Sequence, residues 1–135
     1  MTTDEQALHD LLMDYATKAS AGDLQAWLSL WCEDGVQLPV DAPARSGIAN
    51  IRAGMAPAFA AFDLTVTIHS VESACVNGEV GMTHCNYSVR AVPKQGGESI
   101  DIMRDGKALT IYRKQPDGRW KIAYDCVNSN TPVDS

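Results

Sequence analysis

The chain has 135 residues, of which 45% are hydrophobic and 21% are charged, and its net charge is −6 at pH 7. This composition is typical of one globular domain with a sizeable core, and it argues against disorder. The acidic balance and the lack of any lysine or arginine run disfavour binding to nucleic acid or to anionic membranes. We therefore expect one domain over residues 1–135, with a partly frayed tail over 128–135 and with neither nucleic acid nor a membrane as partner.

The sequence carries no motif for a membrane span, a metal or a cofactor. Its first residues are polar and acidic, and no apolar run reaches the roughly 18 residues of a membrane helix. The four cysteines lack the C-x-x-C spacing of zinc sites, so we interpret them as reduced thiols of a cytoplasmic protein and expect no metal and no cofactor. They are Cys32, Cys75, Cys85 and Cys126.

Apolar residues at helical spacing predict three helices in the first half of the chain. A capping box formed by Thr3 and Gln6 begins the first helix. Asp23 caps the second helix, whose apolar positions extend as far as Trp31. The third helix is predicted over residues 48–62.

The rest of the chain alternates apolar and polar residues and is rich in β-branched side chains, which indicates strands. A short strand over residues 35–40 is followed later by two hairpins, with turns at Asn77-Gly78 and Asp117-Gly118. Helices followed by antiparallel strands are typical of an α+β fold. We expect a cone-shaped α+β barrel, in which the three N-terminal helices pack in a strongly curved mixed or antiparallel sheet around a pocket.

The register of the last hairpin decides where Asp125 points. If Asp117-Gly118 forms a two-residue turn, Thr110 pairs with Asp125 and shares its face. Tyr112 then pairs with Ala123 on the same face. A turn one residue longer would change the register and point the carboxylate away from the protein.

The first hairpin carries two of the three histidines. A two-residue turn at Asn77-Gly78 pairs Val71 with His84. It also pairs His69 with Asn86. Both faces of this hairpin carry apolar residues, so we expect the helices to cover one face and a second copy of the chain to cover the other. The prediction is a homodimer formed through the outer face of the sheet.

Four stretches, spread over nearly the whole chain, form a recognisable pattern. They are Tyr15 with Ala21-Gly22-Asp23-Leu24, then Leu30-Trp31-Cys32-Glu33-Asp34-Gly35, then Arg45-Ser46-Gly47 before Ile51-Arg52, and Asp117-Gly118-Arg119-Trp120-Lys121-Ile122. With these residues the chain resembles the nuclear transport factor 2-like superfamily, specifically its SnoaL-like and ketosteroid isomerase-like members. The resemblance implies the cystatin-like cone fold. Members of the superfamily include isomerases, dehydratases, cyclases, epoxide hydrolases and non-catalytic binding or association domains.

The resemblance also bears on the catalytic residues. Tyr15 falls where ketosteroid isomerases place the tyrosine that hydrogen-bonds the developing oxyanion. The position of their carboxylate base corresponds to Pro39, and that of their protonated aspartate corresponds to Thr110. The resemblance therefore implies that steroid isomerase activity is absent. Asp41 is near the missing base in sequence.

The remaining ionisable residues suggest general acid–base chemistry. The two hairpin registers and the superfamily fold together place His69, His84 and Asp125 on the pocket lining. Histidine titrates near neutral pH, and a carboxylate facing an apolar pocket has a raised pKa, so both types can transfer protons there.

We assign three catalytic candidates, which are Tyr15, His84 and Asp125. The substrate-binding candidates are Trp31, Met55, Phe59, His69, Asn86, Thr110 and Tyr112. For each of them a structural role is the alternative: a histidine satisfied in the core or at an interface, an aspartate that bonds the backbone or pairs with a lysine or arginine, and aromatics that only fill the core.

Two hypotheses for the function follow. The first is a small-molecule-binding protein that acts as a cofactor-independent lyase, isomerase or cyclase on a small hydrophobic carbonyl compound. The second is a non-catalytic ligand-binding or dimerisation domain of the same fold. An epoxide-hydrolase-like activity would need a set of paired aspartates and an arginine that we do not find in the sequence.

Overall fold

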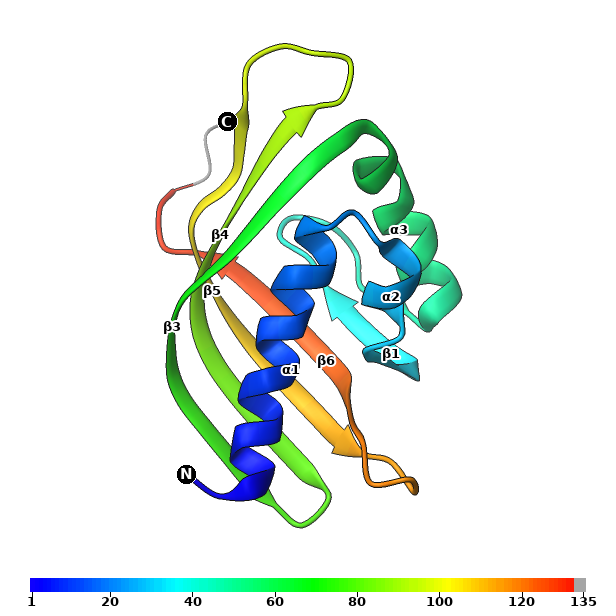
Figure 1. Cartoon of the computed structure of the whole chain (residues 1–135), viewed down its shortest axis with the longest axis vertical. Helices are drawn as coiled ribbons and strands as arrows, with labels where there is room; N and C mark the ends of the chain where they lie inside the picture. Colours follow the sequence, from blue (N-terminus) through cyan, green and yellow to red (C-terminus); the bar gives the residue numbers. More distant parts are fainter. Residues whose placement is uncertain (133–135) are drawn as a thin grey trace.

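The computed structural model describes residues 1–132 and shows three helices and six strands (Figure 1). The helices are α1 (Thr3–Ser20), α2 (Leu24–Leu28) and α3 (Ile48–Ala61). The strands are β1 (Trp31–Leu38), β2 (Arg45–Ser46), β3 (Phe62–Asn77), β4 (Val80–Pro93), β5 (Ile100–Lys114) and β6 (Trp120–Ser129). The predicted α+β class is confirmed.

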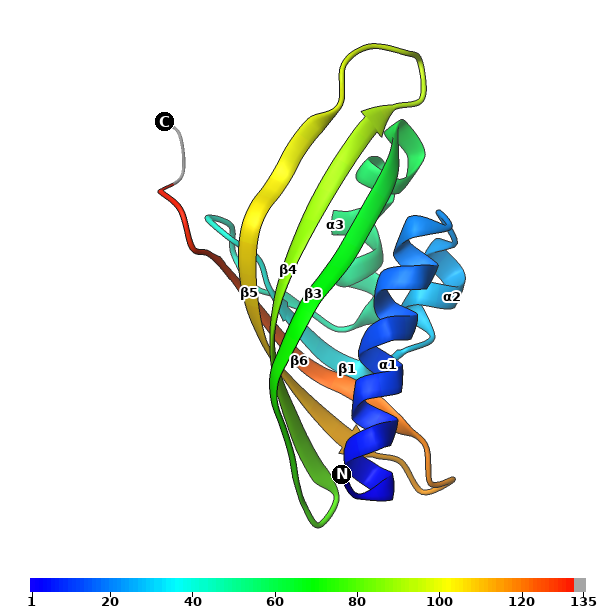
Figure 2. The same ribbon diagram turned by 60° about the vertical axis from the view of Figure 1, so that its left-hand side comes forward.

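The strands form one mixed sheet in the order β2-β1-β6-β5-β4-β3. The pairing of β1 with β6 is parallel, and every other pairing is antiparallel. Helix α1 lies along one face of the sheet and contacts β3, β4 and β6, while α2 and α3 cover the part near β1 (Figures 1 and 2). The strong curvature and the cone shape expected for the sheet stay predictions.

The helix ends follow from short-range hydrogen bonds. The N-cap of α1 is Thr2, and its side chain and that of Glu5 form the capping box. The predicted box at Thr3 and Gln6 is therefore wrong by one residue. The cap predicted at Asp23 is confirmed, because its carboxylate accepts a hydrogen bond from the amide of Ala26 at 3.0 Å.

Helix α2 is shorter than predicted. It ends at Leu28, and Trp31 begins strand β1 instead of lying on the helix. The reason is the parallel pairing with β6, in which the amide of Ile122 donates to the carbonyl of Leu30 at 2.8 Å. The strand therefore begins at Trp31, four residues before the start predicted over residues 35–40, and it ends at Leu38.

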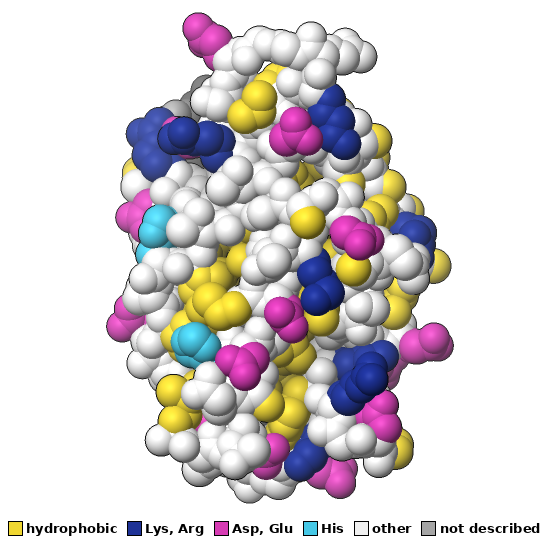
Figure 3. All heavy atoms as spheres, viewed as in Figure 1, with side chains coloured by type: hydrophobic (Ala, Val, Ile, Leu, Met, Phe, Trp, Pro, Cys, Tyr) yellow, Lys and Arg dark blue, Asp and Glu magenta, His cyan; other side chains and the backbone are white. Residues whose placement is uncertain are grey.

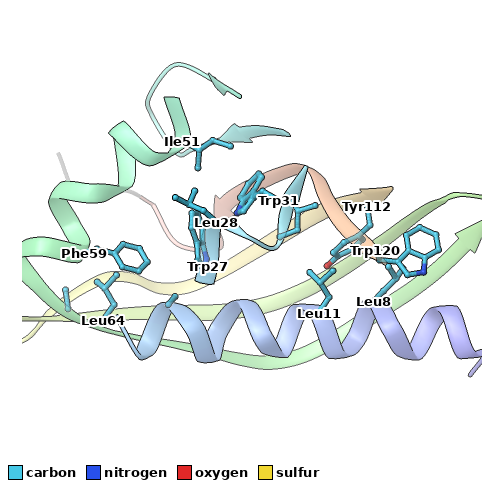
Figure 4. Close-up of a cluster of buried hydrophobic side chains, with 13 residues drawn as sticks. Leu8, Leu11, Trp27, Leu28, Trp31, Ile51, Phe59, Leu64, Tyr112 and Trp120 are labelled. Carbon is cyan, nitrogen blue, oxygen red and sulfur yellow. The ribbon is translucent and has the colours of Figure 1, made fainter. Parts of the chain in front are cut away.

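The core lies between the helices and the sheet (Figure 4). Trp27 occupies its centre, with ring centroids 5.5 Å from Trp31 and 5.9 Å from Phe59. Leu8 and Leu11 of α1 extend this core along the sheet. Helix α1 is thus held by apolar contacts along its length.

The last hairpin keeps the predicted pairing of Thr110 with Asp125. The turn is longer than two residues, because the amide of Gln115 donates to the carbonyl of Arg119 at 2.7 Å. An irregularity after Ile111 adds one residue to β6, so that Tyr112 pairs with Ile122 and the predicted pairing with Ala123 is wrong. The longer turn and the bulge compensate for each other, and Asp125 keeps its inward direction.

The first hairpin departs from the predicted register. Asn77 pairs with Val80, so the two residues of the turn are Gly78 and Glu79, and the turn lies one residue later than predicted. His84 pairs with Ser73, and Asn86 pairs with Ser70; the predicted pairs with Val71 and His69 are wrong. The shift arises at the turn. Two irregularities in β3, between Val71 and Ser73 and between Ile68 and Ser70, then reverse it step by step, so that Ile68 and Tyr87 are in the predicted register.

Further observations concern the C-terminal end, the surface and the helices. Strand β6 continues through Asn128 and Ser129, which the sequence places in the frayed tail; the final three residues of that tail lie outside the described part of the chain. On the face that carries α1, basic and acidic side chains are interspersed (Figure 3). None of the helices within residues 1–132 is long and apolar enough to cross a membrane.

Helix α1 is seated on β4 at a glycine. A Cβ atom at Gly81 would lie 2.6 Å from Cδ1 of the fully buried Leu8. We expect Gly81→Ala to lower the free energy of unfolding by about 1–3 kcal/mol because of this overlap. Leu8→Ala alone leaves a cavity and costs about 2–5 kcal/mol. Urea denaturation measures both effects.

The double variant is the control for this contact. In Gly81→Ala/Leu8→Ala the leucine that clashes is gone, so the combined loss is expected to be smaller than the sum of the two single losses. Losses that add to within about 0.5 kcal/mol would show that the two residues do not interact.

Candidate functional site

A small cavity lies between α1 and the inner face of strands β3 to β6. Its volume is about 20 Å³, which leaves room for about one water-sized group. The apolar part of the lining comes from Leu12, Val66, Ile68, Ala108, Ile122 and Val127. The polar groups are few, and they surround one carboxylate.

That carboxylate belongs to Asp125 of β6. Its residue is 4% exposed, and it accepts hydrogen bonds from the Thr110 hydroxyl at 2.9 Å and the Tyr15 hydroxyl at 3.2 Å. None of the ion pairs among the described residues includes Asp125. Burial therefore raises the pKa of Asp125 to about 6, and the hydrogen bonds from Thr110 and Tyr15 offset only part of this effect.

Tyr15 reaches the cavity from α1, and its ring rests edge-on against Trp27 with the centroids 5.2 Å apart. Burial, followed by the nearby Asp125 carboxylate, raises the pKa of Tyr15 well above its usual value. The hydroxyl group therefore stays protonated and donates to Asp125. The sequence predicts that this hydroxyl faces a ligand carbonyl, whereas here its proton points at the carboxylate.

Tyr112 contributes its ring to the cavity wall. Its hydroxyl lies 2.8 Å from that of Thr83, and both residues are buried. Burial raises the pKa of Tyr112, so its phenol is neutral as well. The structure thus brings four predicted residues together at one cavity, namely Tyr15, Thr110, Tyr112 and Asp125.

Two other lining residues were not among the predicted candidates. Burial raises the pKa of Cys85 to about 11, so its sulfur is a thiol at neutral pH and not a nucleophilic thiolate. Burial also raises the pKa of Tyr87. The signal that could have identified both is their alternation with Val66 and Ile68 on the more apolar face of the first hairpin.

The other polar candidates lie on the opposite face of the sheet. His69 is exposed, and its Nε2 lies 2.8 Å from the hydroxyl of Ser88. Asn86 donates to Ser70 and Glu72. His84 is half-buried in a shallow outer depression beside Leu109 and Cys126. None of these three contributes to the cavity lining.

The remaining candidates belong to the core. Trp31 is 0% exposed and Phe59 is 5% exposed, and both pack in the central hydrophobic cluster. The Met55 sulfur accepts hydrogen bonds from Gln37 at 3.5 Å and Arg45 at 3.4 Å. None of these three side chains reaches the cavity. Their size, which suggested a substrate wall, serves packing between α2, α3 and the sheet.

A larger cavity adjoins the small one. Its volume is about 760 Å³, and Tyr87 and Val127 line both. Asp41, which follows β1 and has a positive φ of 53°, belongs to the lining of this outer cavity and not of the inner one. It is therefore not positioned to replace the base that is missing at Pro39.

The chemistry available at the inner cavity is proton transfer. A carboxylate with a pKa near neutrality, no cation beside it and an apolar surround can act as a base or as an acid. Within residues 1–132, no three His, Cys, Asp or Glu side chains come together in a way that could hold a metal ion.

Comparison with solved structures shows the same fold in several bacterial proteins. A ketosteroid isomerase-like protein from Erwinia carotovora atroseptica is 18% identical, with a TM-score of 0.80 over 98% of this chain and 100% of its own. A candidate dehydratase of the nuclear transport factor 2-like family from Streptomyces avermitilis is 17% identical, with a TM-score of 0.83 over 96% and 99%.

A third similar structure is a candidate aromatic ring hydroxylase from Novosphingobium aromaticivorans. It is 21% identical, with a TM-score of 0.84 over 97% of this chain and 92% of its own. Identities this low establish the fold alone. A comparison with curated proteins found no match.

The family model for the SnoaL-like domain matches residues 13–123, which is most of the chain and includes Tyr15, Thr110 and Tyr112. The observed arrangement of the sheet and helices agrees with this family match. The chain therefore belongs to the SnoaL-like domain family, and it shares its fold with solved proteins of the nuclear transport factor 2-like group.

Proposed function

We propose that this protein binds a small hydrophobic carbonyl compound and catalyses proton transfer on it without a cofactor, with Asp125 as the general base. The observation that carries the proposal is the buried carboxylate at the cavity, which has two hydroxyl donors and no ion-pair partner among the described residues. Because the pKa of Asp125 is about 6, the group is mostly ionised at pH 7 and can still hold a proton once it has accepted one.

Each hydroxyl has a role in this cycle. While Asp125 is ionised, Tyr15 and Thr110 donate hydrogen bonds to it. When Asp125 takes a proton from the carbon next to a carbonyl, its negative charge is lost and a negative charge develops on the carbonyl oxygen. The Tyr15 hydroxyl can then donate to that oxygen, since its own pKa is too high for it to ionise. The reaction classes are enolisation, dehydration and cyclisation.

The comparisons are consistent with this chemistry. A candidate dehydratase and a ketosteroid isomerase-like protein share the fold. His84, a catalytic candidate from the sequence, has no part in the proposal because it lies on the outer face. We also place the protein in the cytoplasm, because its four cysteines are free.

One observation favours the alternative, a non-catalytic binding domain. The hydroxyls of Tyr15, Thr110 and Tyr112 already have partners inside the protein. A ligand oxygen would therefore have to displace one of these hydrogen bonds. The exchange experiment below separates the two functions.

The pH dependence of stability tests the state of Asp125. Between pH 4 and 6 the folded protein keeps a proton that the unfolded chain has lost, because the pKa rises from 3.8 to about 6 on folding. The free energy of unfolding should therefore fall by about 3 kcal/mol over this range, relative to Asp125→Asn, and stay level above it. Urea denaturation of both proteins between pH 4 and 7 measures the difference.

Thr110→Val gives the matched control. Its hydroxyl makes the stronger of the two hydrogen bonds that lower the pKa of Asp125. Its loss should therefore raise this pKa and extend to higher pH the range over which the free energy of unfolding falls. Tyr15→Phe should do the same to a smaller extent. If this pH range is unchanged in both variants, or moves to lower pH, the assignment of the two hydrogen bonds is contradicted.

Hydrogen exchange tests catalysis without knowledge of the substrate. In D₂O, the protein should accelerate the loss of the α-proton NMR signals of neutral ketones such as 2-butanone and 4-acetylbiphenyl. Asp125→Asn should slow this exchange by about 10²- to 10⁴-fold, the usual contribution of a general base. His84→Ala is the control and should exchange at the wild-type rate. If the wild type exchanges no faster than Asp125→Asn, the binding-domain alternative is correct.

We also propose that the protein is a homodimer through the outer face of the sheet. Leu109 is 45% exposed and Tyr124 is 47% exposed on this face. They adjoin Met82 and Ile111 on neighbouring strands, so the apolar surface runs across β4, β5 and β6. A second copy would cover this surface with an equivalent one.

Light scattering tests the dimer. The expected particle mass at micromolar concentration is twice the chain mass of 14.6 kDa. Leu109→Glu should convert it to the monomer, because a carboxylate would be buried in the contact. Asp117→Lys, at the exposed turn between β5 and β6, is the control and should remain dimeric. A wild-type monomer would refute the dimer.

A further inference from the structure

The two adjoining cavities differ greatly in size. The inner one holds about one water-sized group, whereas the outer one, at about 760 Å³, is in the range of sites for drug-sized ligands. A carbonyl or hydroxyl group can enter the inner cavity, but a ring system cannot enter it with the side chains as they stand. The body of any ligand that reaches Asp125 therefore has to lie elsewhere.

We propose that the ligand is an elongated neutral molecule, whose polar head lies at Asp125 while its apolar body occupies the outer cavity. The placement of the head rests on the proposed function, whereas the placement of the body does not. Tyr87 and Val127 separate the two parts, since both residues line both cavities.

The walls of the outer cavity suit an apolar body. Val40, Val89, Ile102 and Met103 contribute to its lining. Val89 also packs against the main core, so this wall is anchored to the rest of the molecule. Met103 has a flexible thioether side chain, which can adapt to ring systems of different shape.

The charges at the outer cavity disfavour an anionic ligand. The lining includes two carboxylates, Asp41 and Asp101, and one guanidinium, Arg104. The Arg104 Nε lies 3.8 Å from one oxygen of Asp101, and the Arg90 Nε lies 3.5 Å from the other. The lining itself carries one more carboxylate than guanidinium, and this balance disfavours a carboxylate or phosphate on the ligand. The ligand class is a neutral ketone, aldehyde or alcohol with an extended apolar skeleton.

A series of phenolic probes tests the length and charge of the ligand. Isothermal titration calorimetry at pH 8 compares phenol, 4-phenylphenol and 4′-hydroxybiphenyl-4-carboxylate. We expect 4-phenylphenol to bind at least tenfold tighter than phenol, and the carboxylate to bind several-fold weaker than 4-phenylphenol. Equal affinity for phenol and 4-phenylphenol would overturn the proposal, and tighter binding of the carboxylate would overturn the neutral class.

A matched pair of variants locates the body of the probe. Ile102 lines the outer cavity and is 52% exposed, while Ile100 is 48% exposed on the same strand and does not line it. Ile102→Trp should weaken the binding of 4-phenylphenol at least tenfold and leave the binding of phenol unchanged. Ile100→Trp should change neither. If the two variants behave alike, the body does not lie in the outer cavity.

Asp125→Asn separates this inference from the proposed function. It should weaken the binding of 4-phenylphenol about tenfold and leave unchanged the binding of biphenyl, which lacks the hydroxyl. If it weakens neither while Ile102→Trp weakens 4-phenylphenol, the outer site stands, and the head placement and the proposed function are both wrong.

Discussion

The burial of the Asp125 carboxylate without a cation is the constraint on which the site depends. Such a group is costly to keep charged, and its side-chain hydrogen-bond donors among residues 1–132 are two hydroxyls, from Tyr15 on α1 and Thr110 on β5. These hydrogen bonds join one helix to two strands at the cavity. The site therefore exists only when α1 is docked on the sheet, and the contacts of Leu8 and Leu11 with the core are part of its construction.

Irregularities in the strands decide which groups meet. In the last hairpin a longer turn is followed by a bulge after Ile111, and the two shifts cancel before Thr110 and Asp125. In the first hairpin a displaced turn changes the partners of His84 and Asn86, and two bulges in β3 restore the register by Ile68. A bulge moves every later side chain by one position, so the inward direction of one carboxylate depends on backbone details several residues away.

Much of the fold can be predicted from local rules. The α+β class, the cap at Asp23 and the pair Thr110–Asp125 all follow from short-range signals. The alternation of the first hairpin also groups most of its side chains into two faces, but it places Val71 with the histidines, whereas Val71 pairs with Cys85 and packs on the inner face. Nor does it tell which face is inward. The face with Val66, Ile68 and Tyr87 packs under α1, because it is the more apolar one, and the histidines are left outside.

The misplaced aromatic residues have a similar cause. Trp31 and Phe59 are large and apolar, and such side chains serve equally well as a ligand wall or as core. Their spacing along the chain cannot separate the two roles, because the choice depends on where α2 ends and how α3 lies against it. The cavity is lined instead by Tyr15 and Leu12 of α1 and by strands that meet only in the folded chain.

Among the strands of residues 1–132, β3 is the last in the sheet and is 16 residues long, so one of its sides has no strand of this part of the chain beside it. A long free edge of this kind is a template on which a strand of another molecule can pair and start a fibril. The same irregularities that displace His69 and Glu72 interrupt the even spacing of the amide groups along this edge. An incoming strand would lose its register within a few residues. The edge strand is thereby protected against aggregation, despite its length.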